Sequence, residues 1–147
     1  MPTPINVLLI EDDKESASLV TTAAQMAKTA FVFSFAANGL DALDYLYQQG
    51  KFADVGRPDI IILDMNLPIL SGWEVLQGMR KRPDLCAIPV VLLTTTSSHD
   101  NIKKEFGLTD QCCYTKPDRF NEYISLMAML EKLHREGRLD RVQVTIA

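Results

Sequence analysis

The stretch Ile60-Ile61-Ile62-Leu63 contains no polar residue and runs directly into Asp64. Short apolar runs rich in Ile and Val are typical of parallel strands whose two faces are both covered by helices. Three more runs have this form and end on polar residues: 7–10 before Glu11-Asp12-Asp13, 90–93 before Thr94-Thr95, and 112–115 before Lys116-Pro117. In such sheets ligands bind beyond the carboxyl ends of the strands, so we expect these polar side chains to meet at one edge.

Strand-like and helix-like patterns alternate five times along the chain. The expected strands are 5–10, 31–35, 59–63, 90–93 and 111–115. Apolar residues at helical spacing predict helices over about 14–28, 40–47, 71–81, 98–106 and 118–136. Because successive parallel strands are joined by right-handed crossovers, we predict an α/β, doubly wound, flavodoxin-like sheet. Its five parallel strands would lie in the order 2-1-3-4-5, with helices on both faces.

Proline, glycine and serine residues set the expected boundaries. Pro83 is expected to end the third helix, Ser97 or Ser98 to cap the fourth, and Gly107 to stop it. The segment 49–58, with two glycines and a proline, is the longest expected connection. We expect one domain over residues 1–147, with a core of about 5–136 and a tail of 137–147.

Composition excludes several classes of function. With 147 residues and 47% hydrophobic content the chain suits one globular domain. The net charge is −4, so a nucleic-acid partner is not expected. No apolar run approaches the roughly 20 residues that span a bilayer, and the N-terminus does not resemble a secretory signal. We therefore expect a cytoplasmic protein without a membrane partner. Cys86, Cys112 and Cys113 fit no zinc spacing.

The expected strand order brings Glu11 and Asp12 close to Asp64. Carboxylates this close repel one another, so at neutral pH they need a cation or a shared proton. Oxygen ligands with room for water suit Mg²⁺, and a carboxylate is also a competent nucleophile toward phosphorus. Lys116 could neutralise phosphoryl oxygens, and Thr94 could donate a hydrogen bond to one of them. The plainer interpretation, that strand ends simply attract polar residues, accounts for only one or two of these positions.

Taken in order, the motifs resemble the receiver domain of bacterial response regulators over about residues 5–136. The residues that carry the resemblance are Glu11-Asp12, Asp64 with Asn66, Pro68 and Gly72, then Thr94, then Lys116-Pro117. The stretches Asp64-Met-Asn-Leu-Pro and Leu93-Thr-Thr are similar to small stand-alone regulators paired with phytochrome-type histidine kinases. The resemblance implies a response regulator of a two-component system, partnered by a histidine kinase and by an unknown downstream protein.

By the same resemblance, Asp64 accepts a phosphoryl group from a histidine of the kinase. Glu11, Asp12 and Asp64 hold Mg²⁺, with the Asn66 backbone carbonyl as a further ligand. Thr94 is the hydroxyl that moves toward the phosphoryl group, and Lys116 forms its ion pair.

Three further residues shape loops in such domains. Pro68 and Gly72 shape the loop after Asp64, because proline fixes φ and glycine permits conformations that other residues avoid. The Lys116–Pro117 bond is often cis in the resembled domains. Asn66 and Thr95 are expected to tune hydrolysis of the phosphoryl group.

Two positions depart from the resembled pattern. Cys113 stands where an aromatic switch residue is common, and Tyr114 follows one step later, which on a strand points to the opposite face. Thr95 stands where a smaller residue is usual, beside the path of hydrolytic water. We therefore expect an unusual output route and slow loss of phosphate.

The last expected helix is unusually apolar. Phe120, Tyr123, Ile124, Met127 and Leu130 form one stripe, which Leu126, Met129 and Leu133 widen. The helix is either deeply packed or presents a second stripe to another subunit, with Tyr123, Leu126, Met129 and Leu133 as the candidate interface of a homodimer. In the tail, Val142, Val144 and Ile146 alternate, so the tail could add an edge strand or dock on a partner.

Two other functions compete with the signalling switch. Haloacid-dehalogenase-type phosphatases also use a strand-end aspartate with Mg²⁺, but they usually carry a second carboxylate two residues later, where this chain has Asn66. A nucleotide- or flavin-binding module would need a glycine-rich loop after the first strand, where this chain has Glu11-Asp12-Asp13.

Overall fold

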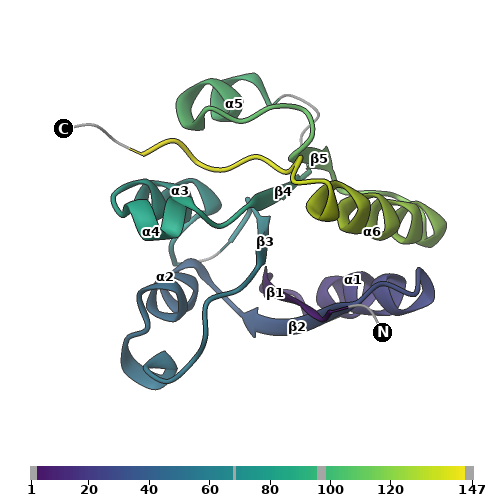
Figure 1. Ribbon diagram of the computed structural model, residues 1–147, viewed down its shortest axis with the longest axis horizontal. Coiled ribbons are helices and arrows are strands. Elements are labelled where there is room, and N and C mark those ends of the chain that lie inside the picture. The colour runs from purple at the N-terminus through teal and green to yellow at the C-terminus, as the bar shows by residue number, and fades with distance from the viewer. Residues whose placement is uncertain (1–2, 68, 96–98, 145–147) are drawn as a thin grey trace.

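Five parallel strands form one sheet in the order β2-β1-β3-β4-β5 (Figure 1). The computed structural model describes residues 3–67, 69–95 and 99–144. The strands are β1 (Ile5–Ile10), β2 (Phe31–Ala36), β3 (Ile60–Asp64), β4 (Val90–Thr94) and β5 (Cys113–Thr115). This is the predicted doubly wound sheet, with β1 and β3 side by side at the point where the strand order reverses.

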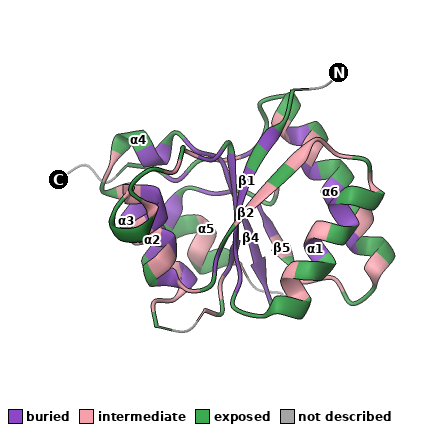
Figure 2. Ribbon diagram, turned by 90° about the horizontal axis from the view of Figure 1, so that it is seen from below, coloured by how far each residue is buried: buried purple, intermediate pink, exposed green. Residues whose placement is uncertain are grey.

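Helices cover both faces of the sheet. They are α1 (Lys14–Met26), α2 (Gly39–Tyr47), α3 (Gly72–Arg80), α4 (Pro83–Cys86), α5 (Asp100–Phe106) and α6 (Phe120–Arg135), with a short 3₁₀ helix at Gly50–Phe52. Helices α1 and α6 lie on one face, and α2 to α5 lie on the other (Figure 2). The sheet therefore separates two apolar cores, one against each layer of helices.

The burial of the two central strands, β3 and β4, explains why both appear in the sequence as continuous hydrophobic runs. Every residue of β3 and β4 is buried. Side chains alternate between the two cores along each strand: Leu63 and Leu92 pack on the α3 and α5 side, whereas Ile62 and Leu93 pack on the α1 and α6 side. Because helices exclude water from both faces of the sheet, the residues that point to either face must be apolar. The strands therefore appear as unbroken hydrophobic runs.

Most predicted boundaries agree with the structure. The side chains of Asp13, Asn38 and Ser71 each accept a hydrogen bond from a backbone N–H in the first turn of α1, α2 and α3. Gly107, at φ 70°, ends α5 as expected. Ser97 and Ser98, the expected caps of that helix, lie outside the described residues, and α5 begins at Asp100.

Pro83 was expected only to stop the third helix. Helix α3 already ends at Arg80, and Pro83 opens the short helix α4. Proline suits a first helical position because its φ is already helical and its missing N–H would have had no partner there.

The described part of the segment after α6 packs on its own domain and forms no strand as far as residue 144 (Figure 1). Leu139 is buried in the core on the α1 and α6 side, and Val142 is buried in the opposite core. The backbone carbonyl of Asp140 accepts a hydrogen bond from the Val90 N–H at 3.1 Å. The segment is therefore part of the packed structure up to Val142. Ile146 lies outside the described residues.

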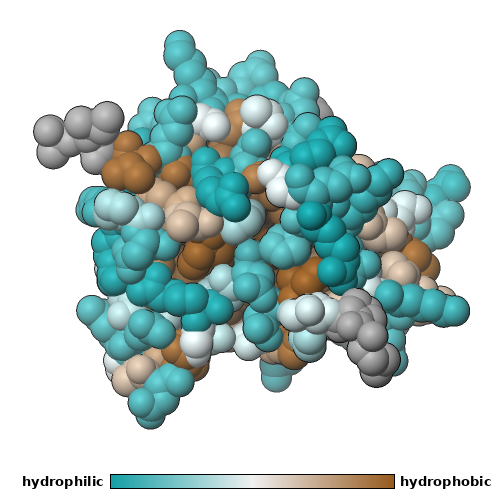
Figure 3. Space-filling model, in the orientation of Figure 1, coloured by the Kyte–Doolittle hydropathy of each residue, from teal (hydrophilic) through white to brown (hydrophobic). Residues whose placement is uncertain are grey.

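None of the helices in the described ranges has the length and apolar character needed to cross a membrane. On the face seen in Figure 3, the described apolar residues form small patches between hydrophilic ones.

Candidate phosphorylation site

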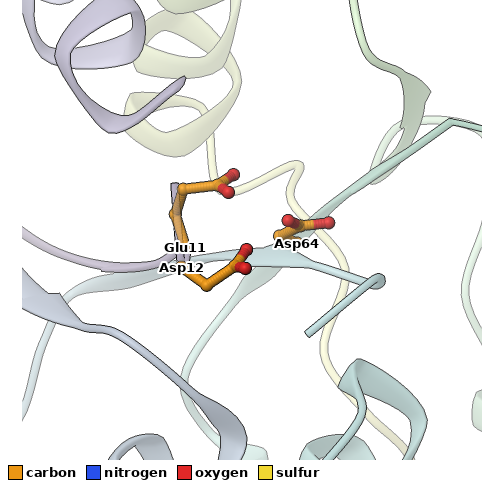
Figure 4. Close-up of side chains that lie close together, drawn as sticks. All are labelled: Glu11, Asp12 and Asp64. Atoms are coloured by element: carbon orange, nitrogen blue, oxygen red, sulfur yellow. The ribbon is translucent and has the colours of Figure 1, made fainter. Parts of the chain in front are cut away.

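The carboxyl ends of β1 and β3 bring three carboxylates together. Ile10 pairs with Leu63, so Glu11 and Asp64, the residues that follow them, lie at the same height along the sheet. The side chains of Glu11, Asp12 and Asp64 point toward one another (Figure 4). One oxygen from each carboxylate lies within 4.8 Å of the others. The predicted acidic cluster is thus formed by two adjacent strands.

Burial differs among the three acids and affects their charge. Asp64 is 3% exposed and Glu11 is 9% exposed, whereas Asp12 is exposed to solvent. Burial, followed by repulsion from the Asp64 charge, raises the pKa of Glu11 to about 7. An ionised Glu11 is therefore unfavourable unless a positive charge lies close by.

Lys116 supplies such a charge from the end of β5. Its backbone N–H donates to the Thr94 carbonyl at 2.8 Å, which fixes the chain beside β4. Its Nζ atom lies 3.2 Å from Asp64 Oδ2 and 3.3 Å from Glu11 Oε2. Burial opposes the charged form of Lys116, but attraction to Asp64 and Glu11 outweighs it and raises the Lys116 pKa. The ammonium therefore stays protonated in the pocket.

The Lys116–Pro117 peptide bond is trans, which differs from the expectation drawn from the resemblance. The two isomers of a bond before proline differ little in free energy, so local packing decides between them. The trans form keeps Lys116 within reach of both carboxylates.

Thr94, Asn66 and Thr95 stand around Asp64. Thr94 is the buried last residue of β4, one step beyond Leu93, the residue paired with Asp64. The Asn66 N–H donates to Asp64 Oδ1 at 2.9 Å, and the Asn66 side-chain amide donates to Thr95 Oγ1 at 3.0 Å. The structure therefore brings all the predicted polar residues around one carboxylate.

The loop after Asp64 is held close to the sheet. A Cβ atom on Gly72 would lie 2.7 Å from Met65 Cα, so only glycine fits there. Pro68 lies outside the described residues. Ile69 adopts φ 69°, which is strained for a β-branched residue, and its side chain is 72% exposed. Sequence reasoning missed this strain, because no local pattern predicts a left-handed isoleucine.

The donor set fits a hard divalent cation. Three carboxylate oxygens converge, two of the acids are largely buried, and oxygen ligands are what such cations prefer. The pocket is thus an acidic metal-binding cluster with one ammonium at its edge.

Cys113 and Tyr114 face opposite sides of β5, as predicted. Cys113 packs with Leu92 in the core on the α3 and α5 side, whereas Tyr114 packs in the other core. A hollow of about 240 Å³ remains beside Cys113 and Thr94, and Trp73 lines it. Sequence reasoning did not place Trp73 next to Thr94, because that contact depends on how α3 packs on the sheet.

The candidate interface on α6 is mostly core. Tyr123, Leu126 and Leu133 are 6%, 7% and 8% exposed, and only Met129, at 40%, is exposed. The stripe is wide because α6 packs against both α1 and the sheet. Three of the four candidate residues are therefore packed within the domain, as in the deeply packed alternative, and Met129 alone of the four is exposed.

Comparison with known proteins agrees with this geometry. Residues 7–128 match the family described as response regulator receiver domain. The chain is 33% identical over 133 residues to the response regulator Rcp1 of Synechocystis sp., covering 90% of each chain.

Solved structures give the same picture. The phosphorylated cyanobacterial phytochrome response regulator RcpA superposes with a TM-score of 0.80 at 30% identity, over 92% of this chain and 96% of that one. The Mn²⁺-bound form of Rcp1 superposes with a TM-score of 0.74 at 32% identity, over 97% of this chain and 100% of that one.

Proposed function

We propose, because the chain belongs to the family of response regulator receiver domains, that Asp64 is its phosphoacceptor in two-component signalling. Members of this family act in signalling, so the protein is a signalling protein rather than an enzyme. The observation that carries the assignment of Asp64 is the contact of its Oδ2 with Lys116 Nζ at 3.2 Å, inside a pocket that also holds Glu11. Asp64 is thereby buried, paired with a cation and placed next to further acids.

The phosphoryl transfer follows from these groups. An oxygen of Asp64 attacks phosphorus, the bond from phosphorus to the donor histidine nitrogen breaks, and that nitrogen keeps the electron pair and takes up a proton. Lys116 offsets negative charge on the transferred oxygens, and the hydroxyl of Thr94 donates a hydrogen bond to one of them. Because Lys116 already lies beside Asp64, this ammonium needs little rearrangement before the transfer.

We assign the cation to Mg²⁺, held by Glu11, Asp12 and Asp64 with the backbone carbonyl of Asn66. When bound, it neutralises the acids and the phosphoryl oxygens. The Mn²⁺-bound relative supports a divalent ion at such a cluster.

The phosphatase alternative has weaker support. It needs a general acid near the leaving group, and the residue two positions after Asp64 is Asn66, whose amide is far too weak an acid for that role. The amide of Asn66 is instead bound to Thr95.

The phosphoryl donor follows from the relatives. RcpA is a phytochrome response regulator, and a bacteriophytochrome response regulator, RtBRR, is 34% identical with a TM-score of 0.73. We therefore propose that a histidine kinase of phytochrome type is the donor and that the protein itself acts in the cytoplasm. Self-association, for which Met129 is the one exposed member of the predicted interface, stays a prediction that light scattering decides.

Incubation with acetyl phosphate and Mg²⁺ tests the assignment. We expect one added phosphoryl group per chain, loss of labelling in Asp64→Asn, and little turnover of other phosphate esters. Asp59→Asn is the matched control, because Asp59 lies before β3 and accepts a hydrogen bond from the Asn6 N–H. Equal labelling of Asp64→Asn and the parent, or rapid hydrolysis of many esters, would contradict the proposal.

A further inference from the structure

The hollow beside the phosphorylation site has an aromatic wall contributed by α3. Its volume is about 240 Å³, and Thr94, Cys113, Trp73 and Ile102 line it. Trp73 is half-buried and is the only tryptophan of the chain. The space exists because Cys113 is small, and the neighbouring aromatic residue, Tyr114, packs on the opposite side of the sheet.

We infer that Trp73 senses the phosphorylation state of Asp64. When Asp64 carries a phosphoryl group, the Thr94 hydroxyl turns toward it, and the Trp73 ring moves further into the hollow beside Cys113. This inference rests on the proposed role of Asp64 as phosphoacceptor, and it names the residue through which that site is read.

Hydrogen bonding to the phosphoryl group and burial of apolar surface both favour the movement of Thr94 and Trp73. A phosphoryl group adds three strong acceptor oxygens, and adjacent strands are only about 4.8 Å apart, so Thr94 on β4 comes within reach of a group that extends from Asp64 on β3. When the Thr94 side chain turns toward the phosphoryl group, the residues that line the hollow lose their contacts with it. The half-buried ring of Trp73 regains those contacts and buries more apolar surface.

Trp73 is also connected to α5. Its ring meets the ring of Phe106 edge to face, with centroids 5.1 Å apart. The Arg80 guanidinium lies 4.8 Å from the centre of the Phe106 ring and forms an ion pair with Glu105 at 2.8 Å. Movement of Trp73 therefore displaces the C-terminal turn of α5.

The C-terminal segment extends this chain of contacts. The Gln143 N–H donates to the Phe106 carbonyl at 3.1 Å. A shift at the end of α5 is thus passed to the segment that docks after α6.

Fluorescence of the single tryptophan gives the first test. The full chain is held with Mg²⁺ and excess acetyl phosphate, and intact mass measures the extent of labelling. We expect the emission of Trp73 to move to shorter wavelength and its quenching by acrylamide to decrease. Failure of labelling would count against the phosphoacceptor role, whereas full labelling with unchanged emission and quenching would overturn the role of Trp73.

Matched variants separate movement into the hollow from a change in nearby charge. Cys113→Phe fills the hollow, and Cys113→Ser leaves it open; both are expected to be labelled, but only Cys113→Ser to show the emission shift. A full shift in labelled Cys113→Phe would contradict the inference.

Hydrogen exchange tests the connection to α5. In the parent we expect phosphorylation to change exchange in peptides that cover Asp100–Phe106. Trp73→Leu is expected to abolish this change while labelling persists, and Trp73→Phe to preserve it, because a phenyl ring still meets Phe106. An unchanged α5 response in labelled Trp73→Leu would show that α5 is reached by another route.

Discussion

The side-chain amide of Asn66 donates a hydrogen bond of 3.0 Å to the hydroxyl of Thr95. The backbone N–H of Asn66 donates at the same time to Asp64 Oδ1, at 2.9 Å. The backbone and the side chain of Asn66 are therefore both hydrogen-bonded, and the loop after β3 is joined to the loop after β4 beside Asp64, the proposed phosphoacceptor. We expect water that hydrolyses an acyl phosphate at Asp64 to approach past this bridge.

Thr95→Ala is expected to shorten the lifetime of the phosphorylated protein. The change removes the acceptor of the Asn66 amide and opens space for water, and the loss of one hydrogen bond of about 1 kcal/mol corresponds to roughly fivefold in rate. The decay of labelled protein after removal of acetyl phosphate measures it. Thr95→Ser keeps the hydroxyl and should decay like the parent. Decay of the parent that equals or exceeds that of Thr95→Ala would contradict the role of Thr95.

Lys116→Met should destabilise the protein in the absence of divalent ions. Removal of one partner of a buried ion pair costs about 3–5 kcal/mol, and we expect about 2 kcal/mol here because the Lys116 side chain is 21% exposed. Urea unfolding at pH 8, without and with Mg²⁺, measures this loss, and Mg²⁺ should restore part of it. Lys51→Met is the control, because the Lys51 side chain is 68% exposed in its pair with Asp41. Equal stability of the two variants would refute the argument.

Mg²⁺ binding should strengthen as pH rises toward 7. The folded-state pKa of Glu11 is raised from 4.5 to about 7, first by burial and then by Asp64. The neutral carboxyl therefore stabilises the metal-free fold below pH 4.5, and this stabilisation is lost as pH rises through 7. Because the metal requires the ionised form, binding at pH 6 releases a proton.

Calorimetric titration of Mg²⁺ in two buffers of different ionisation enthalpy counts this proton. Glu11→Gln should bind more weakly and with a flatter pH dependence. Affinity of the parent that stays constant from pH 6 to 8 would show that Glu11 is already ionised.

Ile69→Gly is expected to stabilise the fold by about 1 kcal/mol, since left-handed backbone at a non-glycine residue costs on the order of 1–3 kcal/mol. At φ 69° and 72% exposure, Ile69 loses strain and little packing when it is replaced. The midpoint of urea unfolding measures the gain. Ile69→Ala keeps the strained conformation with a Cβ atom and should bring no such gain; a similar gain in both variants would show that the side chain, not the backbone, is responsible.

Val142→Ala is expected to lower stability by about 2 kcal/mol, as for other buried truncations of aliphatic side chains. Val142 is 2% exposed in the core against α3 and α5, whereas Val144 is 42% exposed. Val144→Ala is therefore the matched control and should change stability by less than about 0.5 kcal/mol. Thermal or urea unfolding of the pair decides whether the C-terminal segment is part of the cooperative fold.

The strand order and the site could be predicted because both depend on short-range patterns. The unbroken run 60–63 reveals a central strand, and a polar residue at its end falls on the functional edge whatever the helices do. The edge strand was less well placed: residues 111–115 were expected, and only Cys113–Thr115 pair as a strand. Strand β4 begins at Val90, but the Val90 N–H donates to the Asp140 carbonyl of the C-terminal segment, so pairing with β5 begins only at Leu92.

Contacts between elements could not be predicted in the same way. The apolar positions of α6 look alike whether they face α1 or a second subunit, and only packing shows that Leu126 faces inward while Met129 does not. The hollow lined by Trp73 and the strain at Ile69 likewise result from the fit of loops and helices on the sheet. Local sequence patterns do not predict how loops and helices pack on the sheet.

Lys116 and Glu11 stand 105 residues apart in the chain and meet only in the finished sheet. During synthesis, Asp64 leaves the ribosome long before the ammonium that completes its pocket. A nascent chain therefore exposes Asp64 before Lys116 is present to stabilise a phosphoryl group on it. Competence for signalling is conferred only when the last strand has taken its place at the edge.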